Sequence, residues 1–303
     1  MNRLAILASL LLVMNTSVRA EQIVALTASN QLVTFDSATP GSLISTVAIS
    51  GLLSGDALVG IDLRPSNNTL YGFAVGAVAG GPASGVGKVY SFNLATGAAT
   101  LAATLSADPT DATPPTPYAS TSGTYFGVDF NPVADRLRVV SDTGQSLRIN
   151  VATGLTQLDG ALAYAAADAN AGTTPQVFAS AYTNSVAGAA TTALYNLDGA
   201  IGTLVTQAPP NDGTLNTVAL VDAIVSPDSA FDISGQTGTA FVVLDGSTLN
   251  TINLSTGAIN QLGAIGALSS IADIAVLAAL VPEPSSALIL FASLSVFAIR
   301  ARL

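Results

Sequence analysis

The sequence contains no cysteine and no histidine. Without cysteine the chain forms no disulfide, and it has neither a thiolate nucleophile nor a thiolate metal ligand. Without histidine it lacks the commonest general base and the commonest zinc ligand, and the usual serine hydrolase triad is excluded. These two absences remove most of the common catalytic and metal centres.

Charged side chains are scarce, at 9% of the residues. Lys88 is the only lysine, and the only glutamates are Glu21, at the first position of the body, and Glu283, beyond its end. Any acid–base pair within the repeats after Glu21 must therefore consist of aspartates. The formal net charge of −10 at pH 7 repels phosphate backbones, so we expect no nucleic-acid partner. We also expect no resident cofactor.

Apolar residues are abundant, at 50% of the chain, and are mainly alanine, leucine and valine. This composition provides enough apolar area for a substantial core and is not that of a disordered chain.

The N-terminus has the three parts of a secretory signal peptide. Arg3 gives a short positive region, and residues 4–14 are apolar. Val18-Arg19-Ala20 then has small residues at the positions of a cleavage site. We expect residues 1–20 to be removed by signal peptidase before Glu21.

The C-terminus has a different pattern. It consists of Val281, Pro282, Glu283 and Pro284, an apolar run over 287–299, and the basic residues Arg300 and Arg302. The prolines favour an extended segment that a protease can read. A helix over 285–299 would be shorter than the ~30 Å bilayer core, which leaves a buried C-terminal helix as an alternative. The lack of a polar face and the terminal arginines favour a transient membrane anchor.

A Pro-Glu-Pro motif, one short apolar helix and a basic end together resemble the PEP-CTERM sorting signal of Gram-negative bacteria. This resemblance implies that 281–303 is a sorting signal with a short transmembrane helix. It further implies that an exosortase removes the helix after transient anchoring in the inner membrane. The protein would then be exported to the cell surface or the extracellular, exopolysaccharide-containing matrix.

The body of the chain, residues 21–280, repeats itself. Leu58-Val59-Gly60-Ile61-Asp62-Leu63-Arg64-Pro65 is echoed by Tyr125-Phe126-Gly127-Val128-Asp129-Phe130-Asn131-Pro132. Each copy continues with short alternating runs, and Thr-Gly or Asp-Gly supplies the positive φ of a tight hairpin. In later copies the runs cover 177–182, 192–198 and 203–207, and then 230–233, 239–244, 249–254 and 258–262. Each repeat therefore predicts a meander of antiparallel strands, that is, a propeller blade.

The two ends of the body complete the repeat. Residues 21–34 and 42–49 look like the last three strands of a blade, and Ile271–Val276 looks like its missing first strand. Joining them closes a ring and protects the strand edges. We therefore predict an all-β, five-bladed β-propeller with a composite closing blade. A β-sandwich or a β-helix is the alternative, and a six-bladed ring would need one further blade.

The body also resembles an uncharacterised domain-of-unknown-function family of secreted bacterial proteins. The matching signatures are 60–65 with Leu70-Tyr71-Gly72, and 209–215. The family has no established activity, so the resemblance implies no functional residues.

Aspartates recur on the predicted first strands of the blades, which line the channel of a propeller. They are Asp62, Asp129, Asp232 and Asp273, and Ser180 is the counterpart in the third repeat. Carboxylates near one axis could bind a sugar or a cation such as calcium. In the alternative interpretation these aspartates are buried and structural. Asp62 would then bond either to turn N–H groups or to Arg64. Asp129 would bond to Arg136 or to Arg138.

Three loops also need an interpretation. The proline-rich insertion 108–125 carries Tyr118 and Tyr125, which could offer sugar rings a stacking surface; the alternative is a stiffened surface loop. The glycine-rich stretch 76–87 is predicted to be a hairpin loop, because it lacks a Walker lysine. Residues 168–172 have the spacing of a partial calcium loop, but no glutamate follows to complete it, so they are predicted to be a turn.

Three functions remain open. We favour an exported, non-catalytic surface or matrix protein that binds polysaccharide or acts as a scaffold. The second is a glycan hydrolase with two aspartates, since inverting enzymes need carboxyls about 6.5–9.5 Å apart. The third is a spacer without a ligand.

Overall fold

Short alternating runs of apolar and polar residues form strands throughout the body of the chain. The computed structural model describes residues 20–76, 83–111 and 117–278. These residues are all-β apart from one turn of 3-10 helix, η1 (Pro210–Asp212). This part of the chain holds no helix with the length and apolar character of a membrane span. Residues 1–19 of the expected signal peptide and the whole expected sorting signal lie outside the described residues.

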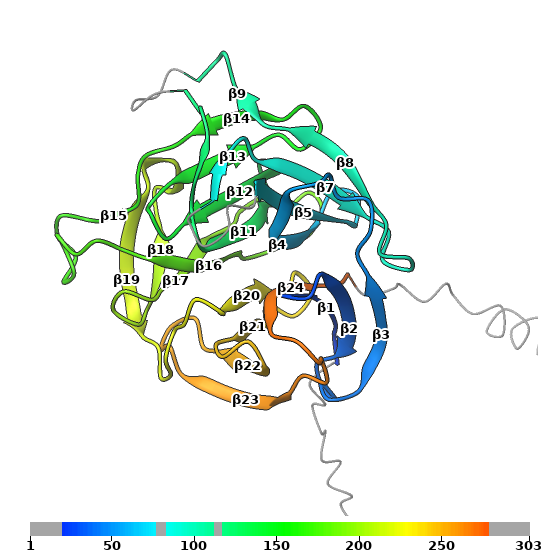
Figure 1. Ribbon diagram of the computed structural model, residues 1–303. Helices are drawn as coiled ribbons and strands as arrows, with labels where there is room; N and C mark the ends of the chain where they lie inside the picture. Colours follow the sequence, from blue (N-terminus) through cyan, green and yellow to red (C-terminus); the bar gives the residue numbers. More distant parts are fainter. Residues whose placement is uncertain (1–19, 77–82, 112–116, 279–303) are drawn as a thin grey trace, which may run out of the picture.

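The strands form five blades around one axis, as predicted (Figure 1). Blade 1 contains β24 (Ile271–Val276), β1 (Gln22–Thr27), β2 (Gln31–Asp36) and β3 (Leu43–Ala48). Blade 2 contains β4 (Asp56–Arg64), β5 (Thr69–Gly76), β7 (Lys88–Phe92) and β8 (Ala99–Thr104). Blade 3 contains β11 (Phe126–Asn131), β12 (Arg136–Ser141), β13 (Ser146–Ile149) and β14 (Leu155–Leu158).

The remaining two blades follow the same order, from the innermost strand to the outermost. Blade 4 contains β16 (Val177–Tyr182), β17 (Leu194–Asp198), β18 (Thr203–Gln207) and β19 (Thr214–Leu220). Blade 5 contains β20 (Ala230–Ile233), β21 (Ala240–Val243), β22 (Thr248–Ile252) and β23 (Ile259–Ala264). In Figure 1 the first strands β4, β11, β16, β20 and β24 lie innermost.

Blade 1 is the composite blade that closes the ring. β24 pairs antiparallel with β1, with Ala25 opposite Ile274 and Val24 opposite Ala275. The first strand of this blade therefore comes from the C-terminal end of the body and the other three from the N-terminal end, which confirms the predicted closure.

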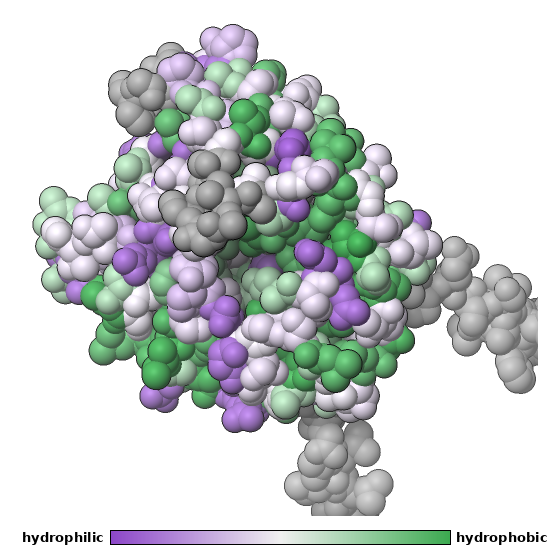
Figure 2. Space-filling view, viewed as in Figure 1, coloured by the Kyte–Doolittle hydropathy of each residue, from purple (hydrophilic) through white to green (hydrophobic). Residues whose placement is uncertain are grey.

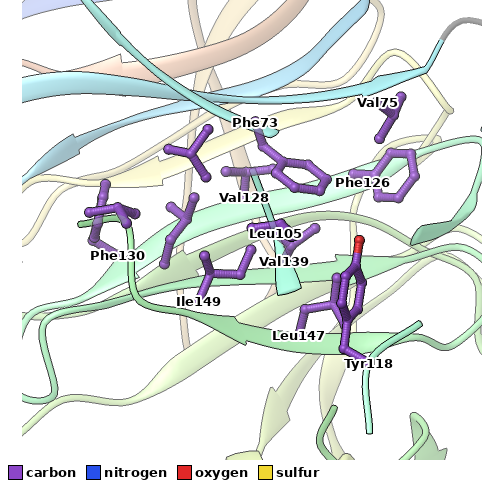
Figure 3. Close-up of a cluster of buried hydrophobic side chains, with 13 residues drawn as sticks. Phe73, Val75, Leu105, Tyr118, Phe126, Val128, Phe130, Val139, Leu147 and Ile149 are labelled. Carbon is purple, nitrogen blue, oxygen red and sulfur yellow. The ribbon is translucent and has the colours of Figure 1, made fainter. Parts of the chain in front are cut away.

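The apolar core lies between the blades, because each blade has two apolar faces and hides both against its neighbours. Figure 3 shows the cluster between blades 2 and 3, in which Phe73 of β5 lies beside Val128 and Phe126 of β11. Phe73 and Phe126 meet edge to face with ring centroids 6.2 Å apart. Similar clusters fill the spaces between the other neighbouring blades.

A repeated turn connects the outer edges of neighbouring blades. In Asn150-Val151-Ala152-Thr153-Gly154 the Asn150 side chain accepts the N–H of Ala152, and Gly154 has φ +77°. The carbonyl of Gly154 accepts the N–H of Ser106, which follows the outer strand of blade 2. The same turn recurs at 93–97 and 253–257, with Gly97 bonded to Ser50 and Gly257 to Asp222.

The structure corrects the strand prediction for the third repeat. Its outermost strand is β19 (Thr214–Leu220), and the blade does not end near Gln207. Two further short strands were not predicted. β9 (Ser106–Ala107) runs parallel to β14, and β15 (Ala163–Tyr164) runs parallel to β19. The third unpredicted feature is a separate ladder of β6 (Ala83–Gly85) with β10 (Thr121–Gly123).

Candidate functional site

Four aspartates lie on the innermost strands, where the repeat predicted them. Asp62 is on β4, Asp129 on β11, Asp232 on β20 and Asp273 on β24. All four are buried. Ser180 takes the corresponding place on β16 and is also buried.

Glycines two residues before Asp62 and Asp129 allow the inner strands to approach closely. A Cβ on Gly60 would lie 2.4 Å from Cγ2 of Val128 and 2.9 Å from Oδ2 of Asp273. A Cβ on Gly127 would lie 2.2 Å from Oγ of Ser180. Only a residue without a side chain fits at these two positions.

Three of the four axial aspartates accept a backbone N–H from the next blade. Asp273 Oδ2 accepts from Ile61 (2.8 Å), and Asp62 Oδ2 accepts from Phe130 (2.7 Å). The Asp232 carboxylate accepts from Val276 in the same way, at 2.5 Å. For Asp129 the backbone N–H of Tyr182 in blade 4 lies close enough to oppose the rise of its pKa.

The second oxygen of three of these carboxylates stays within its own strand. Oδ1 of Asp62, Asp232 and Asp273 accepts the N–H of the following residue, at 2.6, 2.6 and 2.9 Å. Oδ1 of Asp129 differs, because it is buried and has no hydrogen-bond partner among the described residues.

These contacts correct the expected partners of the aspartates. Arg64 does not reach Asp62; it pairs with Asp135 at 2.5 Å. Arg138 does not reach Asp129, because its guanidinium is held by Asp159 at 2.5 Å. Arg64 and Arg138 bond instead to carboxylates at other places, and Arg136 donates to the backbone carbonyls of Ala134 and Asp135. Backbone donors of neighbouring blades take their role at the axis.

The axial carboxylates lie close enough to affect one another. Asp62, Asp129 and Asp232 each offer an oxygen within 4.8 Å of the other two. Burial, followed by repulsion from Asp232, raises the pKa of Asp62 well above its usual range, and burial and Asp62 do the same to the pKa of Asp129. Burial raises the pKa of Asp232 to about 6. Burial also raises the pKa of Asp273.

A polar cavity of about 170 Å³ lies over one end of the axis. Its wall includes Asp62 and Asp232 together with the polar residues Asn68, Ser234 and Gln236. This cavity is a route by which a small solute can approach the carboxylates.

The two tyrosines of the long insertion do not form a common surface. Tyr118 is only 5% exposed; it packs in the cluster between blades 2 and 3, and its hydroxyl accepts the N–H of Gly87. Tyr125 is 37% exposed and packs edge to face against Phe178. The expected stacking surface is therefore wrong for Tyr118, because its side chain packs in an apolar cluster.

A larger groove, which the sequence did not indicate, lies beside blade 5. It has a volume of about 810 Å³. Aromatic rings of Tyr195 and Phe241 line it together with hydroxyls and amides such as those of Thr251, Asn253 and Asn260. Because its residues come from separate parts of blades 1, 4 and 5, no local motif marks it.

The face of the molecule seen in Figure 2 gives no further indication of a single site. Figure 2 shows apolar and polar residues interspersed over one face of the molecule. The turn predicted at 168–172 is present, and Asp168 accepts the N–H groups of Asn170 (2.8 Å) and Thr217 (2.6 Å).

Comparison with known proteins gives one family. The family model described as "Domain of unknown function (DUF4394)" matches residues 31–275. No curated protein matches the chain.

The solved structures that match this chain share little sequence with it. One is a chain of a nidogen/laminin complex, with 10% identity, 86% of this chain and 98% of that chain covered, and a TM-score of 0.43. Another is apo AztD from Citrobacter koseri, with 10% identity and a TM-score of 0.36. This match covers 78% of this chain and 80% of that chain. Likenesses at this level carry no argument about function.

Proposed function

The chain belongs to the DUF4394 family, and we propose that it is an exported protein with a non-catalytic binding or scaffolding role. Its place would be the cell surface or the extracellular matrix. The two ends of the sequence support export, because residues 1–20 have the pattern of a signal peptide and 281–303 resemble a PEP-CTERM signal.

The state of the axial aspartates carries the non-catalytic part of the proposal. A general acid or base must reach a substrate proton within hydrogen-bonding distance. Asp62 and Asp273 are buried and use both oxygens to hold backbone N–H groups. These carboxylates therefore support the ring, and the chain has no histidine or cysteine to replace them in catalysis.

The groove beside blade 5 supports a binding role, and we propose exopolysaccharide as its ligand class. Its volume is in the range of about 300–1,000 Å³ that small-ligand sites have. An aromatic ring such as that of Tyr195 offers a flat apolar face to a sugar, while Asn253 and Asn260 offer amide donors and acceptors to hydroxyl groups.

A glycan-array screen of the purified protein, combined with an assay of reducing-end release, tests this proposal. We expect binding to bacterial exopolysaccharide without release of reducing ends. Tyr195→Ala should weaken binding by about 10-fold or more. Tyr125→Ala, which removes a partly exposed tyrosine from a different place, should leave binding unchanged.

A glycan hydrolase is the second candidate, because Asp232 has a pKa raised to about 6 and lines the axial cavity. Release of reducing ends that is lost in Asp62→Asn or Asp129→Asn would establish it and overturn the first proposal. If neither binding nor release occurs, the protein is a spacer.

Export and processing have their own test. Mass spectrometry of the secreted protein should show a mature N-terminus at Glu21 and loss of the C-terminus near Pro284. Such a result would support signal peptidase and an exosortase as the processing enzymes. A secreted form that retains residues 285–303 would contradict exosortase processing.

A further inference from the structure

The axial carboxylates have no basic counterpart. Asp62, Asp129 and Asp232 bring three oxygens within 4.8 Å of one another. The next acidic neighbours add negative charge, since Asp273 repels Asp62 and Asp129, and Glu21 repels Asp232.

The basic side chains of the described residues are bonded elsewhere. Lys88 pairs with Asp56, and Arg64 pairs with Asp135. Both Arg138 and Arg148 pair with Asp159. Arg136 donates to the carbonyls of residues 134 and 135. A buried charge normally has a partner or binds a metal, and no side chain supplies that partner here.

A second observation points to a missing ligand at the same place. Oδ1 of Asp129 is buried without a hydrogen-bond partner, although Asp129 is only 1% exposed. Oγ of Ser180, on the neighbouring inner strand, is also buried without a partner. Unpaired buried polar atoms are uncommon in native proteins and often indicate water or an ion.

We propose that Asp62, Asp129 and Asp232 bind one hard divalent cation, such as Ca²⁺, on the axis of the propeller. Carboxylate oxygens are the ligands that Ca²⁺ prefers, and an ion that holds oxygens at about 2.3–2.6 Å can span this separation. The ion neutralises the clustered charge and occupies the free oxygen of Asp129. The oxygens that accept N–H groups can still coordinate, because each carboxylate has about four lone-pair sites.

The cavity over the axis provides the path for the ion. Asp62 and Asp232 are part of its wall, so an ion reaches them without crossing the apolar clusters between the blades. Ligands from blades 2, 3 and 5 meet at one ion, and the cation would therefore stabilise the ring as a whole. This role does not depend on glycan binding.

Thermal unfolding of the full protein tests the proposal directly. The protein is treated with EDTA, dialysed at pH 8 and scanned with CaCl₂ from zero to millimolar concentrations. We expect Ca²⁺ at about 100 times its Kd to raise Tm by about 5 °C or more. Titration calorimetry of the wild type should give one ion per chain, and MgCl₂ and MnCl₂ serve as comparisons.

Variants separate a cation ligand from a structural carboxylate. Asp129→Asn removes a charge and a ligand but keeps an oxygen that can accept the N–H of Tyr182. It should therefore abolish the Ca²⁺-dependent shift while the metal-free Tm stays equal or rises. Asp232→Asn should lose the shift as well, and it provides a second test if Asp129→Asn does not fold.

Two control variants should keep the shift. Asp198→Asn changes a buried carboxylate in blade 4 that accepts from Tyr164, Gln176 and Ala200, so it should lower Tm without affecting the response to Ca²⁺. Asp168→Asn tests the turn with the spacing of a partial calcium loop. The proposal is overturned if Ca²⁺, Mg²⁺ and Mn²⁺ leave the wild-type Tm unchanged and calorimetry shows no binding. It is also overturned if Asp129→Asn responds as the wild type does.

Discussion

At the scale of single residues, the axial aspartates connect strands that no ladder connects. Asp273 gives one oxygen to the N–H of Ile274 in its own strand and the other to the N–H of Ile61 in blade 2. A buried N–H without an acceptor costs about 1–3 kcal/mol. Asp62, Asp232 and Asp273 therefore each satisfy backbone groups of two blades at once.

Asp273→Ala removes the acceptors of both Ile61 and Ile274, and we expect the free energy of unfolding to fall by about 2 kcal/mol or more. Urea denaturation gives this value. Asp36→Ala is the control, because Asp36 only accepts the N–H of Ala38 in a surface turn. If the two variants lose the same small amount, the inter-blade bond of Asp273 contributes nothing.

The metal-free protein should become more stable as the pH is lowered from 7.5 to 5. Burial raises the folded-state pKa of Asp232 to about 6 from the ordinary 3.8, and Asp62, Asp129, Asp273 and Glu21 surround the cluster with like charge. Because the folded pKa is above the unfolded one, ionised Asp232 destabilises the fold, and protonation removes this cost as the pH falls through 6.

The full shift at Asp232 corresponds to roughly 3 kcal/mol, and about half of it is recovered by pH 5, because the rest requires a pH below the unfolded pKa. Scanning calorimetry in EDTA should therefore show Tm rising by about 3–5 °C. The measurement must stop near pH 5. At lower pH, stability is lost from Asp135, because its hydrogen bond with Arg64 lowers its pKa. A Tm that falls steadily from pH 7.5 to 5 would show that the pKa values of the axial carboxylates are not raised in the folded protein.

The sequence predicted which residues line the axis but not what they contact. Repetition of Gly-x-Asp placed Asp62 and Asp129 on equivalent strands, and this placement is independent of the neighbours. The expected partners, such as Arg64, were nearby in sequence. The true partners depend on the register between blades, which no local pattern contains.

At the scale of elements, the Asn-x-x-Thr-Gly turn determines how neighbouring blades meet. A Cβ on Gly154 would lie 2.2 Å from the carbonyl oxygen of Thr104 at the end of β8. In the same way, a Cβ on Gly97 would meet the carbonyl oxygen of Ala48, and a Cβ on Gly257 would meet that of Leu220. The glycine is needed both for its positive φ and for the approach of the preceding blade.

Gly154→Ala and Gly238→Ala separate these two requirements. Both glycines have positive φ, +77° and +72°, but a Cβ on Gly238 would meet nothing within 4 Å. In both variants the left-handed backbone should lower the free energy of unfolding by about 1–2 kcal/mol. Only in Gly154→Ala should overpacking lower it by about 1–3 kcal/mol more. Chemical denaturation of both variants measures the difference, and equal losses would show that the blade contact is unimportant.

Most strands could be predicted because alternation is a local signal. The prediction 177–182 coincides with β16 and 203–207 with β18. β19 was missed because Pro209-Pro210 and Asn211-Asp212-Gly213 signal the end of a blade, whereas here they form a turn before its outermost strand. β9 and β15 contain two residues each, which is too short for any pattern.

At the scale of the whole molecule, the pairing of β24 with β1 holds the ring closed. The expected blade stacking and composite closure are both present, because they follow from repetition and from the incomplete repeats at the ends. The groove beside blade 5 could not be predicted, since Tyr195 and Asn253 come together only when blades 4 and 5 pack.

A disulfide across the closing blade tests this closure, and the absence of other cysteines makes its formation unambiguous. Val24 and Ala275 are opposite residues of β1 and β24, within the Cα separation of about 4.4–6.8 Å that a disulfide needs. Val24→Cys/Ala275→Cys should oxidise and gain up to about 5 kcal/mol in the chain-entropy model. Denaturation with and without reductant measures the gain, and failure to oxidise would place β24 elsewhere.

We propose that the molecule has an axis that supports the ring and an outer groove that binds the ligand. The affinities of Asp129→Asn and Tyr195→Ala for the same exopolysaccharide, measured side by side by calorimetry, test this division most directly. We predict that Asp129→Asn binds like the wild type and that Tyr195→Ala binds about 10-fold more weakly. Loss of binding in Asp129→Asn together with wild-type affinity in Tyr195→Ala would place the ligand at the axis and contradict the account.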